Sequence, residues 1–191
     1  MRHHHLPYLL ALLALPACAP KGSSTLTGEE EVGRFQVQAS LRDTECGAGH
    51  EAPAELAFVV DLFHLEGTSR GYWQLPDGPQ IDGLLERSGG FRFATTTQAV
   101  AYPEDLANDV LGCSLDRTEI VEGVLEDGPA PEAPDGGVGE GEPEMGFSGT
   151  TRVRVSASPG GDCRALLSVY GGPFPDLPCV IEYDLDATRV P

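Results

Sequence analysis

Apolar and polar residues alternate in short runs through most of this chain of 191 residues. In the clearest run, residues 34–42, every second side chain is apolar, namely Phe35, Val37, Ala39 and Leu41. Successive side chains of a β-strand point to opposite faces of its sheet. Such a run therefore predicts a strand with one face in the core and the other in water.

The same criterion predicts eight or nine short strands. They cover residues 34–42, 56–65, 72–75, 81–86, 91–101, 115–125, 151–155, 164–170 and 181–187. Residues 56–65 also fit a helical spacing, but their short length and the sequence Phe58-Val59-Val60 favour a strand. One short helix is expected at residues 103–111, which begin with proline, carry acidic residues in the first turn and precede Gly112.

Turn residues, rather than regular helices, join these strands, as at Asp77-Gly78-Pro79 and Ser88-Gly89-Gly90. This arrangement predicts an all-β fold, an antiparallel meander that forms a barrel or a sandwich. Residues 126–146 consist almost wholly of Gly, Pro, Glu, Asp and Ala. They cannot bury enough apolar surface to offset their ordering entropy. We therefore expect a disordered acidic loop within a single domain of residues 34–191.

Residues 1–17 have the pattern of an export signal. Arg2 supplies the positive charge, and residues 6–15 form an apolar run broken only by Pro7. A helix of that length spans about 15 Å, half of the hydrocarbon core of a bilayer. We therefore expect a signal peptide rather than a transmembrane helix.

The sequence Leu15-Pro16-Ala17-Cys18 closes this apolar run and resembles the lipobox of bacterial lipoprotein precursors. In that family the cysteine receives fatty acyl chains such as palmitate and becomes the first residue of the mature protein. The resemblance implies a lipid anchor on Cys18. Because Ala19 rather than aspartate follows, it also implies passage to the outer membrane of a cell envelope. The alternative is simple secretion, with Ala17-Cys18-Ala19 as the cleavage site.

The polar residues 18–33 would then form a flexible tether. The whole chain has 12 basic and 30 acidic residues, a formal charge of −18, and removing residues 1–17 takes away Arg2 and no acid, which leaves −19. Nucleic acid and anionic lipid headgroups repel such a body. We expect no nucleic-acid partner, and contact with a membrane only through the N-terminal lipid.

Four cysteines remain besides Cys18, and in an exported protein an even number predicts two disulfides. They are Cys46, Cys113, Cys163 and Cys179. Of the three possible pairings we favour Cys163–Cys179, since both begin expected strands around one loop, and Cys46–Cys113 by elimination. There is no C-x-x-C motif, so we expect no zinc site and no metal.

The segment Gly67-Thr68-Ser69-Arg70-Gly71 matches G-x-S-x-G, the turn that presents the nucleophile of many serine hydrolases. That chemistry needs a histidine base, which these enzymes place after the serine, and no histidine follows His64. We therefore expect a polar hairpin turn here. His64 is interpreted as a histidine on a strand surface, and His50 lies in a loop.

Acidic and aromatic residues supply the remaining candidates. Asp184-x-Asp186 and the acidic loop lack the full calcium-loop pattern, so both are interpreted as solvated surface. An enzyme of unrecognised type would need a cleft with convergent carboxylates, such as Asp61, Glu66 or Asp82, although their spacing does not indicate such a cleft. Four aromatic residues either line a ligand cavity or, as we favour, fill the core, namely Tyr72, Trp73, Phe91 and Phe93.

These patterns indicate an envelope lipoprotein without catalytic activity, a binding or structural domain displayed on a membrane. A small-ligand-binding β-barrel is one alternative, and an enzyme of unrecognised type is the other. The sequence indicates no cofactor, and it does not identify a protein or small-molecule partner.

Overall fold

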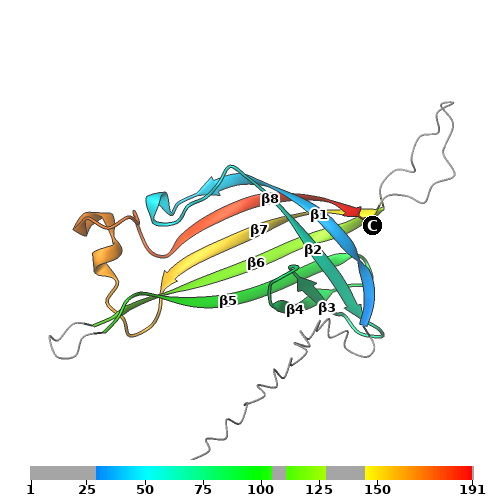
Figure 1. Cartoon of the computed structure of the whole chain (residues 1–191), viewed down its shortest axis with the longest axis horizontal. Helices are drawn as coiled ribbons and strands as arrows, with labels where there is room; N and C mark the ends of the chain where they lie inside the picture. The colour runs from blue at the N-terminus through cyan, green and yellow to red at the C-terminus, as the bar shows by residue number, and fades with distance from the viewer. Residues whose placement is uncertain (1–28, 105–110, 128–144, 191) are drawn as a thin grey trace, which may run out of the picture.

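The structure is a computed structural model that describes residues 29–104, 111–127 and 145–190. Eight antiparallel strands close into a barrel in chain order, and the last strand pairs with the first (Figure 1). The strands are β1 (Glu29–Thr44), β2 (Glu55–Leu65), β3 (Arg70–Gln74), β4 (Gln80–Leu85), β5 (Gly90–Tyr102), β6 (Cys113–Asp127), β7 (Met145–Ala157) and β8 (Cys179–Val190). The predicted antiparallel meander is confirmed, and it forms a barrel.

The alternating residues fill the interior. On β1 and β8 seven inward side chains are at most 5% exposed, namely Phe35, Val37, Ala39, Ile181, Tyr183, Leu185 and Ala187. The seam between these two strands runs from Arg34↔Val190 to Thr44↔Ile181. Because directly opposed residues share a face, the two alternating patterns meet across the seam and bury one continuous apolar wall.

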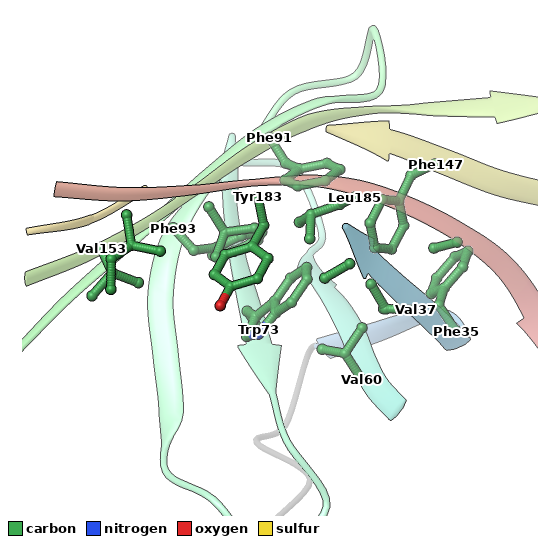
Figure 2. Close-up of a cluster of buried hydrophobic side chains, with 14 of the residues drawn as sticks. Phe35, Val37, Val60, Trp73, Phe91, Phe93, Phe147, Val153, Tyr183 and Leu185 are labelled. Atoms are coloured by element: carbon green, nitrogen blue, oxygen red, sulfur yellow. The ribbon is translucent and has the colours of Figure 1, made fainter. Parts of the chain in front are cut away.

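An aromatic cluster fills the half of the barrel near the start of β1 (Figure 2). The Trp73 ring centroid lies 6.2 Å from that of Phe91, 5.8 Å from Phe93 and 5.9 Å from Phe147, and Phe147 lies 5.2 Å from Phe91. These rings come from β3, β5 and β7, so they join strands that are not neighbours in the sheet. Tilted and edge-to-face pairs at these separations add to the effect of burial.

The wall is weakest at the β3–β4 hairpin, whose strands are the two shortest. β4 pairs with β5 only over Gly83–Leu85, opposite Phe91–Phe93. Within the described part of the chain, residues 94–102 of β5 have no pairing on the β4 side. Inward positions such as Thr97 and Ala99 are consequently exposed. The barrel is thus closed in topology but thin on one side.

The predicted strand at residues 164–170 is wrong. This segment forms two short 3-10 turns, η3 (Arg164–Leu166) and η4 (Ser168–Tyr170). Only part of this segment reaches the core: Leu166 packs against it, whereas Val169 is 77% exposed and Tyr170 65%. Exposed apolar side chains do not stabilise a strand. The chain reverses direction at Gly171, whose φ of 87° favours glycine.

The expected tether ends earlier than predicted, because Glu29–Gly33 already belong to β1. Glu29, Glu30 and Glu31 pair with Leu65, His64 and Phe63 of β2, and a bulge follows before Gly33. Pairing needs only the backbone, so a run of acidic residues does not prevent it. At the far end of the sheet, Glu126↔Gly146 and Asp127↔Met145 are likewise paired strand residues rather than loop.

The other predictions about these segments are not tested. Cys18, residues 18–28 of the tether, residues 105–110 of the expected helix and residues 128–144 of the acidic loop lie outside the described residues.

Two disulfides are present, as predicted, but the favoured pairing is wrong. The bonds are Cys46–Cys179, with Cα atoms 5.1 Å apart, and Cys113–Cys163, with Cα atoms 5.0 Å apart. The reason is the closure of the barrel, which sets the end of β1 beside the start of β8 and so brings Cys46 next to Cys179. Both bonds lie at the end of the barrel opposite the start of β1.

Candidate ligand-binding cavity

A cavity of about 500 Å³ occupies the barrel interior between the aromatic cluster and the end that holds the disulfides. Its walls are mostly apolar and come from six of the strands and the β1–β2 loop. The apolar lining residues are Ala39, Pro53, Leu56, Phe58, Trp73, Leu75, Val121, Val153, Ile181 and Leu185. A cavity of this size and lining falls in the range that holds small molecules in proteins.

Trp73 separates the cavity from the aromatic cluster. Its side chain is 3% exposed and packs on the cluster through Phe93, while Phe58 meets it edge-on with ring centroids 6.4 Å apart. Figure 2 shows Trp73 and Tyr183 among these rings, with the Tyr183 hydroxyl pointing away from Phe91. These rings enclose most of the indole, and the small part that remains exposed borders the cavity.

A pair of charged side chains lies on the inner wall near the rim. Arg117 and Glu119 are two residues apart on β6, so they share a face, and they oppose the buried Val155 and Val153 of β7. The Arg117 Nη1 donates to Glu119 Oε2 at 2.7 Å. The two side chains are 40% and 29% exposed, so the ion pair is only partly desolvated. The positive charge on this wall is therefore already matched by a carboxylate.

His50 and Glu51 bring further polar groups to the rim from the β1–β2 loop. Burial and the charge of Arg117 lower the pKa of His50 below its ordinary value of 6.5. Burial also raises the pKa of Tyr183 above 10, an effect that Arg117 partly opposes. Both side chains are consequently uncharged at neutral pH.

Two contacts hold this loop in place. Cys46, the residue before turn η1 (Gly47–Gly49), is disulfide-bonded to Cys179 of β8. Gly49 lies against the ring of the buried Phe174, where a Cβ atom would come within 2.3 Å of the ring. Only glycine permits that approach, so the rim of the cavity is packed against the β7–β8 loop.

One buried hydroxyl in the cavity wall lacks a partner. Thr151 is 8% exposed, and its Oγ1 atom has no hydrogen-bond partner in the described part of the structure. It lies directly opposite Tyr183 on the inner face of the sheet. An unsatisfied buried hydroxyl costs about 1–3 kcal/mol, so a ligand atom that bonds to it would relieve that cost.

The predicted aromatic candidates divide between two faces of the wall. Trp73 lines the cavity, and Phe91 and Phe93 belong to the core against which Trp73 packs. Tyr72 opposes Phe63 and Asp82, so alternation places it on the other face of the sheet from Trp73. All four side chains are buried, as the core interpretation predicted, although Tyr72, which is 6% exposed, lies outside the interior cluster that contains the other three.

The other sequence candidates do not converge on this cavity. The G-x-S-x-G segment forms the β2–β3 turn, where the His64 Nε2 and the Thr68 carbonyl oxygen are 2.9 Å apart. On the outer face Asp61 is bound by Arg34, and Asp82 by Arg70.

Asp184 is bound by Arg42, and Asp186 is exposed. In the described ranges, no group of three or more His, Cys, Asp or Glu side chains is arranged to hold a metal ion. No helix in those ranges is long and apolar enough to cross a membrane.

The sequence of the strand predicted at residues 115–125 already indicated the charged residues that line the cavity. In residues 115–125, alternation puts Arg117 and Glu119 on the same face as the apolar residues Leu115 and Val121, a face that would be expected in the core. Charged residues at core positions are expensive unless they pair or line a cavity. Nothing local marks the loop of His50, because its place depends on the disulfide. No protein-family model, curated protein or solved structure matches this chain.

Proposed function

We propose that this protein binds a small, largely apolar molecule inside its barrel. The observation that carries the proposal is the cavity of about 500 Å³, with its apolar walls and a few polar groups at the rim and on one side. A barrel of eight strands is just wide enough either to be filled by side chains or to hold one small ligand. Here the aromatic cluster fills one half and leaves the other half open.

The role we propose is binding without catalysis. The carboxylates that an enzyme would use, Asp61 and Asp82, are bound by arginines on the outer face rather than gathered at the cavity. The polar groups that do line the cavity are suited to orienting a ligand. They are an ion pair already satisfied within itself, two side chains uncharged at neutral pH, one unpartnered hydroxyl and the exposed carboxylate of Glu51 at the rim.

The single tryptophan of the chain makes the proposal directly testable, because Trp73 lines the cavity. We would titrate the protein with N-phenyl-1-naphthylamine, a neutral apolar fluorophore, and follow energy transfer from Trp73. We expect saturable binding of one probe per protein. Binding without saturation, or none at all, would refute the proposal.

Variants with larger side chains in the cavity wall test whether the probe binds inside the barrel. Ala39 is 2% exposed and lines the cavity, so Ala39→Phe should lower the affinity for the probe at least tenfold. The second variant is Leu56→Phe at the rim. Leu56 is 39% exposed, so the larger side chain should disturb folding less than one placed at Ala39. Phenylalanine is used rather than tryptophan because a second indole would complicate the energy-transfer signal. Ala99→Phe on the exposed part of β5 is the control and should bind as the wild type does.

We also propose that this barrel is held in a cell envelope by lipid on Cys18. The support is the lipobox-like sequence Leu15-Pro16-Ala17-Cys18 and the two disulfides, which form in oxidising compartments. The intact mass of the protein processed in a bacterial host should lack residues 1–17 and include acyl chains. A Cys18→Ala variant should lack the acyl mass. A wild-type protein that retains its first 17 residues would contradict the proposal.

A further inference from the structure

The side chains around the cavity form two levels along the barrel axis. Near the rim are Arg117 and Glu119, with His50 and Glu51 above them on the loop. Thr151 lies one inward step deeper, because it is two residues before Val153, the residue that opposes Glu119. Two residues of strand correspond to about 6.6 Å. The deeper level carries hydroxyl groups but no charged side chain.

A charged ligand fits neither level. At the rim an anion would meet Glu51 and Glu119, while Arg117, the cation among the described lining residues, is already bound at 2.7 Å. A cation could meet Glu51, but that side chain is exposed to water and an exposed pair contributes little. Pairing with Glu119 would require the cation to displace Arg117. At the deeper level, a buried charge would have only neutral partners, which do not offset its desolvation. An uncharged ligand leaves the ion pair intact.

The unpartnered hydroxyl then specifies where the polar group of the ligand lies. Thr151 Oγ1 is buried in the wall of the cavity. Because this atom is inaccessible as it lies, a rotation about χ1 to another staggered position has to present it to the ligand. A hydroxyl or carbonyl oxygen of a ligand at this depth would satisfy it, and the apolar remainder would lie along Trp73, Ile181 and Leu185.

We infer that the ligand is an uncharged, mostly apolar molecule whose hydroxyl or carbonyl group hydrogen-bonds to Thr151. This inference rests on the proposed function, since it concerns what the same cavity selects. It distinguishes the protein from carriers of fatty-acid-like anions and from carriers of amines, both of which need a buried, unmatched charge of the opposite sign beside the ligand.

Three chains of equal length test the charge preference. We would displace N-phenyl-1-naphthylamine from the wild-type protein at pH 7.5 with 1-decanol, decanoate or decylammonium. We expect 1-decanol to displace the probe at a concentration at least tenfold lower than either ion. Equal or better displacement by decanoate or by decylammonium would overturn the inference while leaving the proposed binding function intact. Absence of probe binding would instead overturn the proposed function.

The Thr151→Val variant tests the position of the polar group. It keeps the shape of the side chain and removes only the hydroxyl, which has no partner to lose, so folding should be preserved. We expect 1-decanol to bind about tenfold more weakly while the affinity for the probe changes less than twofold. The neighbouring Thr150→Val, on the opposite face of β7, should bind 1-decanol as the wild type does. Unchanged 1-decanol affinity in Thr151→Val would overturn the assignment of Thr151.

Discussion

At the scale of single residues, neighbouring charges and burial set the ionisation of groups in the loops. Asp162 accepts hydrogen bonds from the Arg164 Nε at 2.9 Å and from the Arg164 backbone N–H at 3.1 Å. These bonds lower its pKa from the ordinary 3.8 to about 2. The geometry is local, since the two residues flank Cys163 of the second disulfide.

We expect Arg164→Ala to raise the pKa of Asp162 from about 2 toward 3.8, because the side-chain hydrogen bond is the main cause of the shift. A carboxyl with a lowered pKa stabilises the fold above its unfolded pKa, and this contribution is lost as the pH falls from about 4 toward 2. NMR titration of the carboxyl carbon measures the shift. Arg152→Ala, on β7, is the control and should leave Asp162 unchanged.

His50 at the rim of the cavity should make the free energy of unfolding depend on pH near neutrality, a higher range than that of Asp162. Its pKa in the folded protein is lowered, so as the pH falls below about 6.5 the unfolded chain binds a proton before the folded protein does. The free energy of unfolding should therefore decrease between pH 7.5 and 5.5. In His50→Gln this decrease should be smaller, as measured by urea unfolding at both values. The same decrease in both proteins would show that His50 is not involved.

At the scale of elements, the two disulfides differ in their position relative to the cavity. Cys46–Cys179 anchors the loop that carries His50 and Glu51 to the cavity, whereas Cys113–Cys163 ties the start of β6 to the β7–β8 loop. They join residues 133 and 50 positions apart, separations at which chain entropy alone predicts a stabilisation on the order of 4 kcal/mol each.

We expect both double serine variants to lose stability and only one to lose affinity. Replacing Cys46 and Cys179 should lower the affinity for N-phenyl-1-naphthylamine several-fold, because the rim loop is released. Replacing Cys113 and Cys163 should leave the affinity of the folded fraction unchanged. Urea unfolding reports the stability and probe titration the affinity. An equal loss of affinity in both variants would contradict a specific role for the first bond.

The strands were largely predictable from alternation, because one buried face and one wet face leave a period of two in the sequence. Residues 181–187 lie within β8, and residues 91–101 match β5 closely. Residues 164–170 misled the prediction because their apolar side chains serve a compact turn. The disulfide pairing could not be predicted, since it depends on which strands meet when the barrel closes, and this is a long-range property that no local pattern records.

The candidate cavity was only partly predictable for the same reason. Trp73 was identifiable as an aromatic residue on an expected strand, and Arg117 and Glu119 were visible as charges at core positions. Whether such residues fill a core or line a space depends on how many side chains the other strands contribute at the same level. Loop residues such as His50 enter the cavity only through contacts made far along the chain.

At the scale of the whole molecule, the aromatic cluster ties the barrel together across its interior. Phe147 of β7 packs against Phe35 of β1 and Phe91 of β5, with ring centroids 5.3 and 5.2 Å apart. Outside, arginine–carboxylate pairs bridge neighbouring strands, as between Arg152 and Glu182. Such exposed pairs contribute little each, so the interior dominates the stability.

We expect Phe147→Ala, which removes a ring that is 2% exposed, to lower the free energy of unfolding by about 3–5 kcal/mol. Val124→Ala, on the outer face at 48% exposure, should change it by less than about 0.5 kcal/mol. Urea unfolding followed by circular dichroism measures both. A small effect of Phe147→Ala would indicate that the cluster is not the centre of the fold.

The two ends of the barrel are not equivalent. β1 begins at Glu29 beside Leu65 at the end of β2, whereas the loop with His50 and both disulfides lie at the opposite end (Figure 1). A chain anchored through Cys18 therefore enters the barrel at the end remote from the rim. With the proposed acyl anchor on Cys18, the barrel would stand with the rim of its cavity facing away from the membrane, toward the surrounding aqueous space. The ligand would then enter the cavity from the aqueous phase or from another protein, and not directly from the bilayer.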